Sequence, residues 1–418
     1  MKVLLIGDNI TAGNYGAVAT TESLLDLIHK NATNVELKTI DFRYYLGTAP
    51  KEGLPPYDID IYRRGGDPKW ILKDSPIPAS AKPIIQECYD NYPGMVDKVL
   101  KGEILQYEKK CIEETDMVVI NAEGAIVNGT DSKGFYRPQG RYLLFMAYLS
   151  KVVFNKPCFI INHSVDPQNL DIEFIVQNVY PKLDGVYVRE KFSLEYLKKI
   201  GVNNAKYVPD ILWTHDFDND PEVKCPKCLE NFDFSKPYIC LGDSSGLKNA
   251  YNEVSWEVTS VYGALIDKLK ETLGYNIIFV NGHNGYYAPV DAAIMLAELP
   301  YVRLANCSYH ELYYVLKNAK LFISGRWHAS IMSLIGHTPV ILWGGDCFKT
   351  NALHAEIGCK GRFYDVKTIP RNIYQMCEDA VKVLNTPHDD CWEKVEEMKK
   401  LSLKNVDVFM KNIEKKNL

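Results

Sequence analysis

Short apolar runs alternate along the chain with longer stretches in which apolar residues recur every three or four positions. In the first half, the apolar runs lie at residues 3–6, 117–120, 158–161 and 185–188. Continuous apolar runs of this length are typical of parallel strands that are covered on both faces. Helical periodicity is found at residues 20–29 and 142–151. The first half is therefore predicted to be an α/β domain with a parallel sheet.

The same alternation resumes after a polar connector at residues 216–236. Strands are expected at residues 238–241, 276–280, 321–323 and 339–342, and helices at residues 257–272, 290–298, 309–317 and 328–335. We therefore predict two α/β domains, at residues 1–222 and 223–390, with a proline-rich insertion at about residues 50–93. A helix at residues 391–418 is expected to be solvated or to bridge the domains. Ligands of such folds bind outside the carboxyl ends of the strands, so a site is expected between the domains.

Composition and charge exclude several classes of function. The 418 residues carry a net charge of -5, which provides no basic field for nucleic acid. No stretch approaches the ~18 apolar residues of a membrane span, and the apolar start is too short for a signal peptide. The 11 cysteines are scattered, which is typical of reduced thiols in a cytoplasmic protein. We therefore expect a cytoplasmic protein without a nucleic-acid partner, and a weaker alternative places the lysine-rich tail against a membrane surface.

Three short motifs have the form of metal sites. Cys225 and Cys228 form a CxxC pair, but no second pair follows at the spacing of a zinc site. Residues 58–60 and 218–220 read DxD and lie in polar or proline-rich loops. We expect none of the three to bind a metal. Three histidines are expected at the surface: His29, His215 and His388.

Polar residues that follow predicted strands or their first loops are the candidates for chemistry. They are Asn14, Tyr15, Glu123, His163, Arg189, His283, Arg326, His328 and Lys349. Cations, imidazoles and one carboxylate that converge on a cleft suit a small, multiply charged anion and acid–base work. A core role is an equal alternative for His163. Glu123 is either a general acid or base, or a carboxylate that binds helix amides.

The strongest of these signals is the stretch SGRWHAS at residues 324–330, where Arg326 and His328 leave a buried strand and enter a helix. A helix N-terminus and a guanidinium both favour a carboxylate or phosphate. An imidazole with an ordinary pKa near ~6.5 can donate or accept a proton at neutral pH. The alternative is that Arg326 pairs with a structural carboxylate and His328 is a cap residue. We favour the functional interpretation because such a pair at one strand end has no packing role.

Several blocks of the sequence are similar to one protein family. They read NYGAVAT near the start, then INAEGAIVNG, VRExFSxEYLKKIGV, YVPDILW and, most specifically, ISGRWHASIMSLIGHTPVILWGGDCFKTNAL. Their order and spacing agree over roughly residues 1 to 360, apart from the insertion. The chain thus resembles the polysaccharide pyruvyl transferase family.

The resemblance implies a GT-B-like fold, with two Rossmann-like domains that face each other across a cleft. It also implies transfer of the pyruvyl group of phosphoenolpyruvate to two hydroxyls of a sugar, with release of phosphate. The acceptor would be a sugar, an oligosaccharide or a lipid-linked glycan of a surface polysaccharide. The Arg-x-His pair of the family, tied to donor binding and catalysis, corresponds to Arg326 and His328.

The residues fit this chemistry without a cofactor or metal. Arg326, Lys349 and Arg189 are expected to hold the donor anion. We assign His328 as the general acid and Glu123 as the base. The other binding candidates are Asn14, Tyr15, His163 and His283.

Two alternatives come from other classes. The first is a GT-B glycosyltransferase with a nucleotide-sugar donor, for which Asp346 or Glu356 would bind the base or ribose. The second is a non-catalytic protein that binds a sugar or an anion. The acceptor and the oligomeric state stay open.

Overall fold

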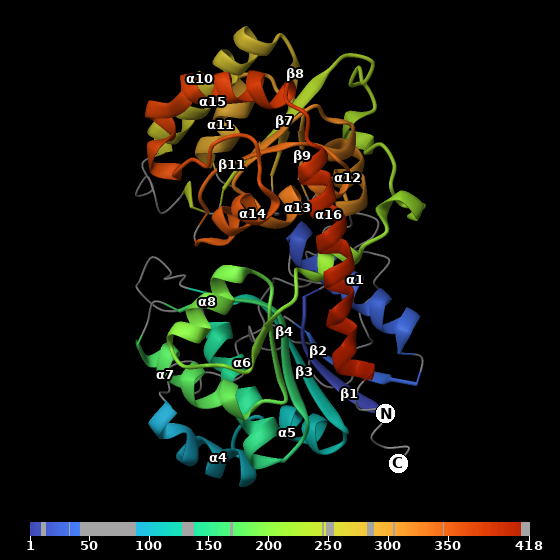
Figure 1. The fold of residues 1–418 in the computed structure, drawn as a ribbon, viewed down its shortest axis with the longest axis vertical. Helices are drawn as coiled ribbons and strands as arrows, with labels where there is room; N and C mark the ends of the chain where they lie inside the picture. Colours follow the sequence, from blue (N-terminus) through green and yellow to red (C-terminus); the bar gives the residue numbers. More distant parts are fainter. Residues whose placement is uncertain are drawn as a thin grey trace.

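The chain folds into two α/β domains, each built on one parallel sheet, as the computed structural model shows (Figure 1). The structure describes residues 1–9, 14–32, 34–41, 89–127, 138–167, 170–244, 246–247, 255–281, 288–303, 306–345 and 347–410. Most of the predicted insertion lies outside these residues.

The first sheet has six strands in the order β2-β1-β3-β4-β5-β6, all parallel. Its strands are β1 (Lys2–Asp8), β2 (Glu36–Asp41), β3 (Met117–Val127), β4 (Cys158–Asp166), β5 (Gly185–Val188) and β6 (Ala205–Tyr207). The four apolar runs form β1, β3, β4 and β5 in the middle of the sheet, as predicted. The edge strands β2 and β6 were not predicted, because neither has a continuous apolar sequence and edge strands do not need one.

Helices cover the first sheet on both sides. They are α1 (Tyr15–Asn31), α4 (Tyr92–Leu100), α5 (Gln106–Glu113), α6 (Pro138–Tyr148), α7 (Leu170–Val179) and α8 (Lys191–Lys199). The prediction was wrong about the start of α1, which begins at Tyr15 and not at residue 20. Asn14 caps this helix, because its Oδ1 accepts a hydrogen bond from Gly16 N at 2.8 Å.

The second sheet has five parallel strands in the order β11-β10-β7-β8-β9. These are β7 (Tyr238–Gly242), β8 (Asn276–Val280), β9 (Tyr301–Val302), β10 (Phe322–Ser324) and β11 (Val340–Leu342). The helices are α10 (Ser255–Leu273), α11 (Ala288–Leu296), α12 (Tyr309–Asn318), α13 (Trp327–Ile335), α14 (Lys349–Ile357), α15 (Ile369–Leu384) and α16 (Asp389–Ser402). The predicted elements are all present, and only the two-residue β9 and the helices α14 and α15 were not predicted.

Two helices tie the domains together. The start of α1 packs in the core of the second domain through Tyr15 and Val18, and its later turns pack in the first domain through Leu24. Helix α16 runs from the second domain back along the first (Figure 1). At its end, Ser402 Oγ donates to the Asp210 carbonyl at 2.7 Å. Of the two roles expected for the C-terminal helix, the structure shows the bridging one.

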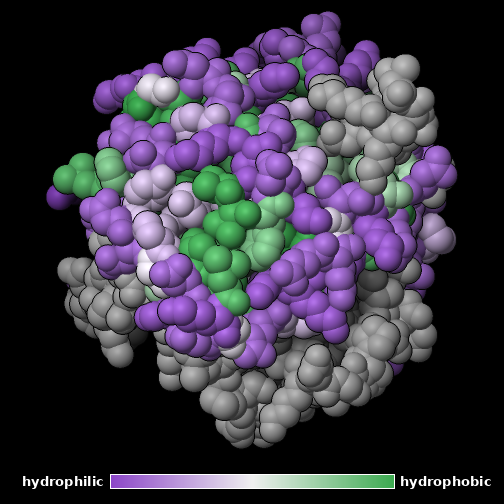
Figure 2. Space-filling view, turned by 90° about the horizontal axis from the view of Figure 1, so that it is seen from below, coloured by the Kyte–Doolittle hydropathy of each residue, from purple (hydrophilic) through white to green (hydrophobic). Residues whose placement is uncertain are grey.

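Among the described residues on the face of the molecule seen from below in Figure 1, hydrophilic residues predominate. Figure 2 shows hydrophilic residues there around one central group of hydrophobic residues. In the part of the chain that the structure describes, no helix combines the length and the apolar character needed to cross a bilayer.

Candidate active site

Three side chains from the two domains meet at the carboxyl ends of the strands. Arg189 follows β5, Asp210 lies in the connector after β6, and His328 lies in the first turn of α13. Arg189 Nη1 donates to Asp210 Oδ2 at 2.7 Å, and His328 Nε2 lies 3.4 Å from each of these two atoms. Trp327 Nε1 also donates to Asp210 Oδ2, at 3.1 Å. We call Arg189, Asp210 and His328 the arginine–aspartate–histidine cluster.

Arg189 and Asp210 form a buried ion pair, with side chains 1% and 0% exposed. The Nε atom of Arg189 also donates to Ser164 Oγ at 3.0 Å. Although burial disfavours its charge, Arg189 and His328 hold the pKa of Asp210 below its usual range. A buried ion pair with these partners fixes the carboxylate next to the imidazole.

Gly16, in the first turn of α1, lies directly against the imidazole of His328. A Cβ atom at residue 16 would lie 1.9 Å from His328 Nδ1 and 2.3 Å from its Cγ. A residue without a side chain is therefore required at this point of contact between the domains. The backbone of α1 therefore approaches the imidazole of His328 directly.

Glu123 lies inside a strand and not in a loop, because β3 continues past the predicted end at residue 120. Its φ is 41°, a value that L-residues rarely adopt. The register of β3 against β4 is irregular between Glu123 and Ile126. Glu123 Oε1 accepts a hydrogen bond from Asn9 Nδ2 at 2.7 Å. Backbone strain of this kind is concentrated at functional sites in proteins.

The surroundings shift the acid–base properties of both proposed catalytic groups. Burial raises the pKa of Glu123 to about 7, although Arg189 and Asn9 favour the charged form. Burial also lowers the pKa of His328, with Asp210 opposing this shift and the cations Arg189 and Lys349 adding to it. Glu123 therefore changes protonation near neutral pH, where the neutral imidazole of His328 is favoured.

Arg326 and Lys349 differ in their partners. Arg326 binds Asp243, the residue after β7, through two hydrogen bonds, one from Nε to Oδ1 at 2.6 Å and one from Nη2 to Oδ2. This is the carboxylate pairing that was the alternative interpretation of Arg326. Lys349 begins α14, and the described residues offer its ammonium group no hydrogen bond or ion pair. Lys349 is thus the cation of the predicted set that is available to an anionic ligand.

His163 is a core residue. Its Nδ1 lies 2.9 Å from the Tyr187 carbonyl and its Nε2 lies 2.9 Å from Tyr180 Oη. Burial lowers the pKa of His163 to about 3. Both ring nitrogens are therefore used within the protein, which leaves neither for a substrate.

Two of the other predicted binding residues have roles within the fold. Asn14 is a helix cap, and Tyr15 is 1% exposed in the core of the second domain. His283 lies outside the described residues.

Sequence reasoning missed two carboxylates, Asp210 and Asp243. Asp243 follows the strand predicted at residues 238–241, so it should have been among the polar residues selected at strand ends. Asp210 follows β6, which the apolar pattern did not reveal. Among the surface predictions, His215 was wrong, because it is only 9% exposed.

Glu356, the candidate for nucleotide binding in the glycosyltransferase alternative, has partners in the first domain. Its Oε1 accepts from Lys191 N at 2.7 Å and its Oε2 accepts from Tyr207 Oη at 2.8 Å. It therefore links the domains, and Asp346, the other candidate, lies outside the described residues.

Comparison with known sequences agrees with the geometry. The family model for polysaccharide pyruvyl transferase matches residues 14–344. Amylovoran biosynthesis protein AmsJ of Erwinia amylovora is 25% identical over 215 residues, which are 50% of this chain and 47% of AmsJ. The chain therefore matches about half the length of this curated relative.

Two solved structures illustrate the similarity in fold. Sucrose-phosphate synthase of Thermosynechococcus elongatus has a TM-score of 0.56 at 11% identity, over 99% of both chains. The S. aureus MnaA–UDP co-structure has a TM-score of 0.52 at 11% identity, over 94% of this chain and 90% of that one. At such identities the likeness shows the fold alone, and it confirms the predicted GT-B-like architecture.

Proposed function

Because the chain belongs to the polysaccharide pyruvyl transferase family, we propose that it transfers the pyruvyl group of phosphoenolpyruvate to two hydroxyls of a sugar. The acceptor would belong to a surface polysaccharide or its precursor, and the products would be a cyclic ketal and phosphate. The observation that carries the proposal is the arginine–aspartate–histidine cluster, with Glu123 and Lys349 in its electrostatic surroundings. It supplies an imidazole, a carboxyl group and an available cation at one interdomain position.

Donor binding is assigned to the second domain. Lys349 is the side chain best placed to bind the anion, because no described carboxylate pairs with it. The first turn of α13 adds backbone N–H groups that its N-cap residue, Arg326, does not cap with its side chain. Arg326, held by Asp243, and the buried Arg189 contribute positive charge around these groups.

His328 is proposed to protonate the methylene carbon of the donor, which makes C2 electrophilic. In the free protein, burial and two cations favour its neutral form. The phosphate and carboxylate of the donor would offset those cations, so a proton is expected to be taken up as the donor binds. Asp210 orients the ring and stabilises the imidazolium.

Glu123 is proposed to accept the proton of the first sugar hydroxyl as that hydroxyl attacks C2. Phosphate then leaves, the second hydroxyl attacks the same carbon, and the ketal closes. One hydroxyl proton ends on the new methyl group and the other ends on phosphate, so the reaction balances. With a pKa of about 7, Glu123 can accept and release a proton at neutral pH.

The proposal is tested by donor binding to the purified full chain, followed by thermal unfolding. A ligand that binds only the folded chain raises Tm with occupancy. We expect phosphoenolpyruvate to raise Tm, and we expect this shift to shrink strongly in Lys349→Met. Lys367→Met is the matched control, because Lys367 is exposed and is not among the main charges that act on Glu123 or His328. Arg326 is a poorer choice, because its removal would leave the buried Asp243 without its cation.

Three results would decide between the hypotheses. Phosphate release that requires both phosphoenolpyruvate and a sugar acceptor, with a ketal in the product, would establish the transfer. A Tm shift with nucleotide sugars alone would instead support the glycosyltransferase. A shift with phosphoenolpyruvate that is equal in wild type and Lys349→Met would remove Lys349 from donor binding.

A further inference from the structure

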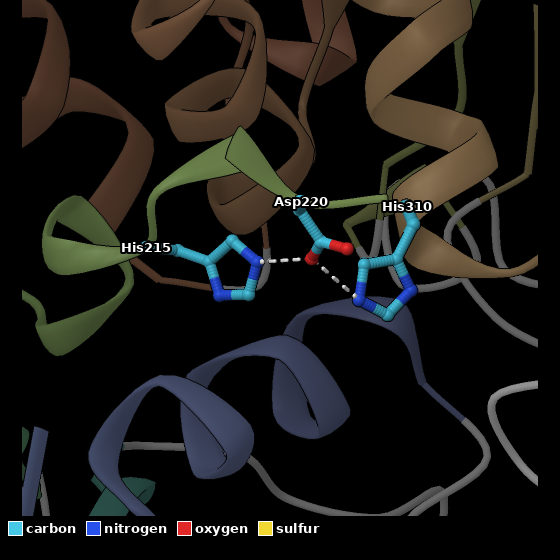
Figure 3. Close-up of side chains that lie close together, drawn as sticks. All are labelled: His215, Asp220 and His310. Atoms are coloured by element: carbon cyan, nitrogen blue, oxygen red, sulfur yellow. Dashed lines mark hydrogen bonds and ion pairs between the residues drawn. The ribbon is translucent and has the colours of Figure 1, made fainter. Parts of the chain in front are cut away.

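A second polar cluster lies beside a later turn of α1, outside the proposed active site. It consists of His215 and Asp220 from the connector between the domains and His310 from α12 (Figure 3). In the part of the chain that the structure describes, no other three His, Cys, Asp or Glu ligand atoms lie within 4.8 Å of one another. We call these three residues the histidine–aspartate cluster. The proposed transfer reaction has no use for it.

We propose that the histidine–aspartate cluster binds a late first-row divalent metal ion, for which zinc is the natural probe. Asp220 Oδ2 lies 3.1 Å from the Nε2 atoms of both His215 and His310. Ligand atoms around a four-coordinate zinc ion are about 3.3 Å apart, given bonds of about 2.0 Å. Figure 3 shows both rings directed at the carboxylate from opposite sides. Two imidazoles and one carboxylate form a donor set that zinc commonly uses, with a fourth position left for water.

The hydrogen bonds around His215 favour a cation between the ring and the carboxylate. Ser23 Oγ donates its single hydrogen to the Ala19 carbonyl at 2.6 Å, so it accepts from His215 Nδ1, 3.2 Å away. In a neutral ring, Nε2 then carries a lone pair that faces Asp220 Oδ2 at 3.1 Å. Two lone pairs at this distance repel unless a proton or a metal ion lies between them. The Nδ1–H bond to a hydroxyl is also the outer-shell contact that orients metal-binding histidines.

The charge of the surroundings supports the same conclusion. Glu22 of α1 is buried, and its Oε2 lies 3.9 Å from His310 Nε2. Tyr309 Oη donates to this carboxylate and fixes it. The two carboxylates beside these imidazoles match the charge of a divalent ion.

The position of the cluster defines what the ion would do. Its ligands come from the connector and from α12, while Ser23 and Glu22 come from α1. The same helix places Gly16 against His328, two turns earlier. A bound ion would therefore fix α1 and the connector against the second domain, which makes it a structural ion.

The test uses the full chain, freed of any affinity tag and stripped of metal by a chelator. We expect saturable binding of Zn²⁺, at about one ion per chain, with a rise in Tm. Co²⁺ should bind with the visible absorption of a four-coordinate site. In Asp220→Asn, which keeps the shape and can still hydrogen-bond, we expect affinity to fall by more than the roughly 10- to 100-fold lost with an outer-shell contact.

Two controls separate this site from other ligands in the chain. His388→Gln changes a histidine outside the cluster, and Cys225→Ser with Cys228→Ser removes the exposed thiol pair. Both should bind Zn²⁺ as wild type does. The proposal would be overturned if Zn²⁺ did not bind wild type, or if it bound Asp220→Asn with unchanged affinity. It would also be overturned if replacing the two cysteines abolished Zn²⁺ binding. Even if a variant does not fold, titration of the wild-type chain with Zn²⁺ still tests the proposal.

Discussion

Two polar clusters flank helix α1, and they differ in how the fold assembles them. The arginine–aspartate–histidine cluster gathers residues from the carboxyl ends of parallel strands, with Arg189 and Asp210 from neighbouring strands β5 and β6. The histidine–aspartate cluster gathers residues from a connector and from the start of α12, with no strand end among them. The first is complete without a ligand, because its buried cation and anion neutralise each other. The second places two imidazoles around one carboxylate, with a further carboxylate nearby.

This difference teaches what parallel topology makes predictable. Strand ends in a parallel sheet meet at one edge, so residues far apart in sequence converge by a general rule. A connector and a helix converge only through the packing of particular side chains. The two clusters should therefore respond independently to substitution, and the Asp210→Ala and Gly16→Ala variants below test that independence.

The largest effect is expected from Asp210→Ala. It removes the acceptor of Arg189 Nη1 and Trp327 Nε1 and leaves a buried guanidinium without its main counter-ion. Loss of one partner of a buried ion pair costs about 3–5 kcal/mol of unfolding free energy. The proposed transfer should also be lost, because His328 loses its orienting carboxylate. Urea denaturation and phosphate release measure the two effects.

Asp216→Ala is the matched control for this variant. Asp216 lies in the same connector but is exposed, so its removal should change the unfolding free energy by about 0.5 kcal/mol or less. Zn²⁺ affinity should be retained in folded Asp210→Ala. Equal stability of the two variants would contradict the buried ion pair as the basis of the cluster.

Glu123→Gln is expected to change the unfolding free energy by less, and to raise it instead of lowering it. Burial raises the pKa of Glu123 from an ordinary value of 4.5 to about 7. Between these values the folded chain holds the proton more tightly than the unfolded chain, so the unfolding free energy falls as pH rises. Above pH 7, the buried charged carboxylate lowers the unfolding free energy by its full amount, about 3 kcal/mol. Glutamine carries no charge and can still accept from Asn9, so the variant should be more stable than wild type at pH 8 and similar at pH 4.

Unfolding curves of wild type and Glu123→Gln at the two pH values measure this difference. The transfer rate should fall in the same variant, because the base is lost. A stabilised but inactive variant would identify Glu123 as a residue kept for function at a cost in stability. A variant that is destabilised at pH 8 would show that its charge is needed by Arg189 for folding.

The sequence pattern was sufficient for the central strands and for the candidates at their ends. Arg189, Glu123 and His328 were found because each follows or extends a continuous apolar run. Asp210 was missed because the edge strand before it is only three residues long and is interrupted by a lysine.

Side-chain partners could not be predicted, because they depend on tertiary packing. Nothing in the local sequence distinguishes Arg326, which pairs with Asp243, from Lys349, which has no partner among the described residues. His215 was placed at the surface, yet its side chain packs against Ser23 of α1 and lies close to His310 of α12. Topology thus selects the region of the site, and packing decides which residues in it are available.

The smallest change is Gly16→Ala, and it tests the contact of α1 with His328 alone. The added methyl group would lie 1.9 Å from His328 Nδ1, so the imidazole must move. A misplacement of about 1 Å can cost roughly 100-fold in rate, and we expect a loss of this size in kcat with little change in Zn²⁺ affinity. Gly263→Ala in α10 is the control, because a Cβ there meets no atom within 4 Å and should leave activity unchanged. If Gly16→Ala weakened Zn²⁺ binding as strongly as it slowed transfer, α1 would couple the two clusters, and their independence would be disproved.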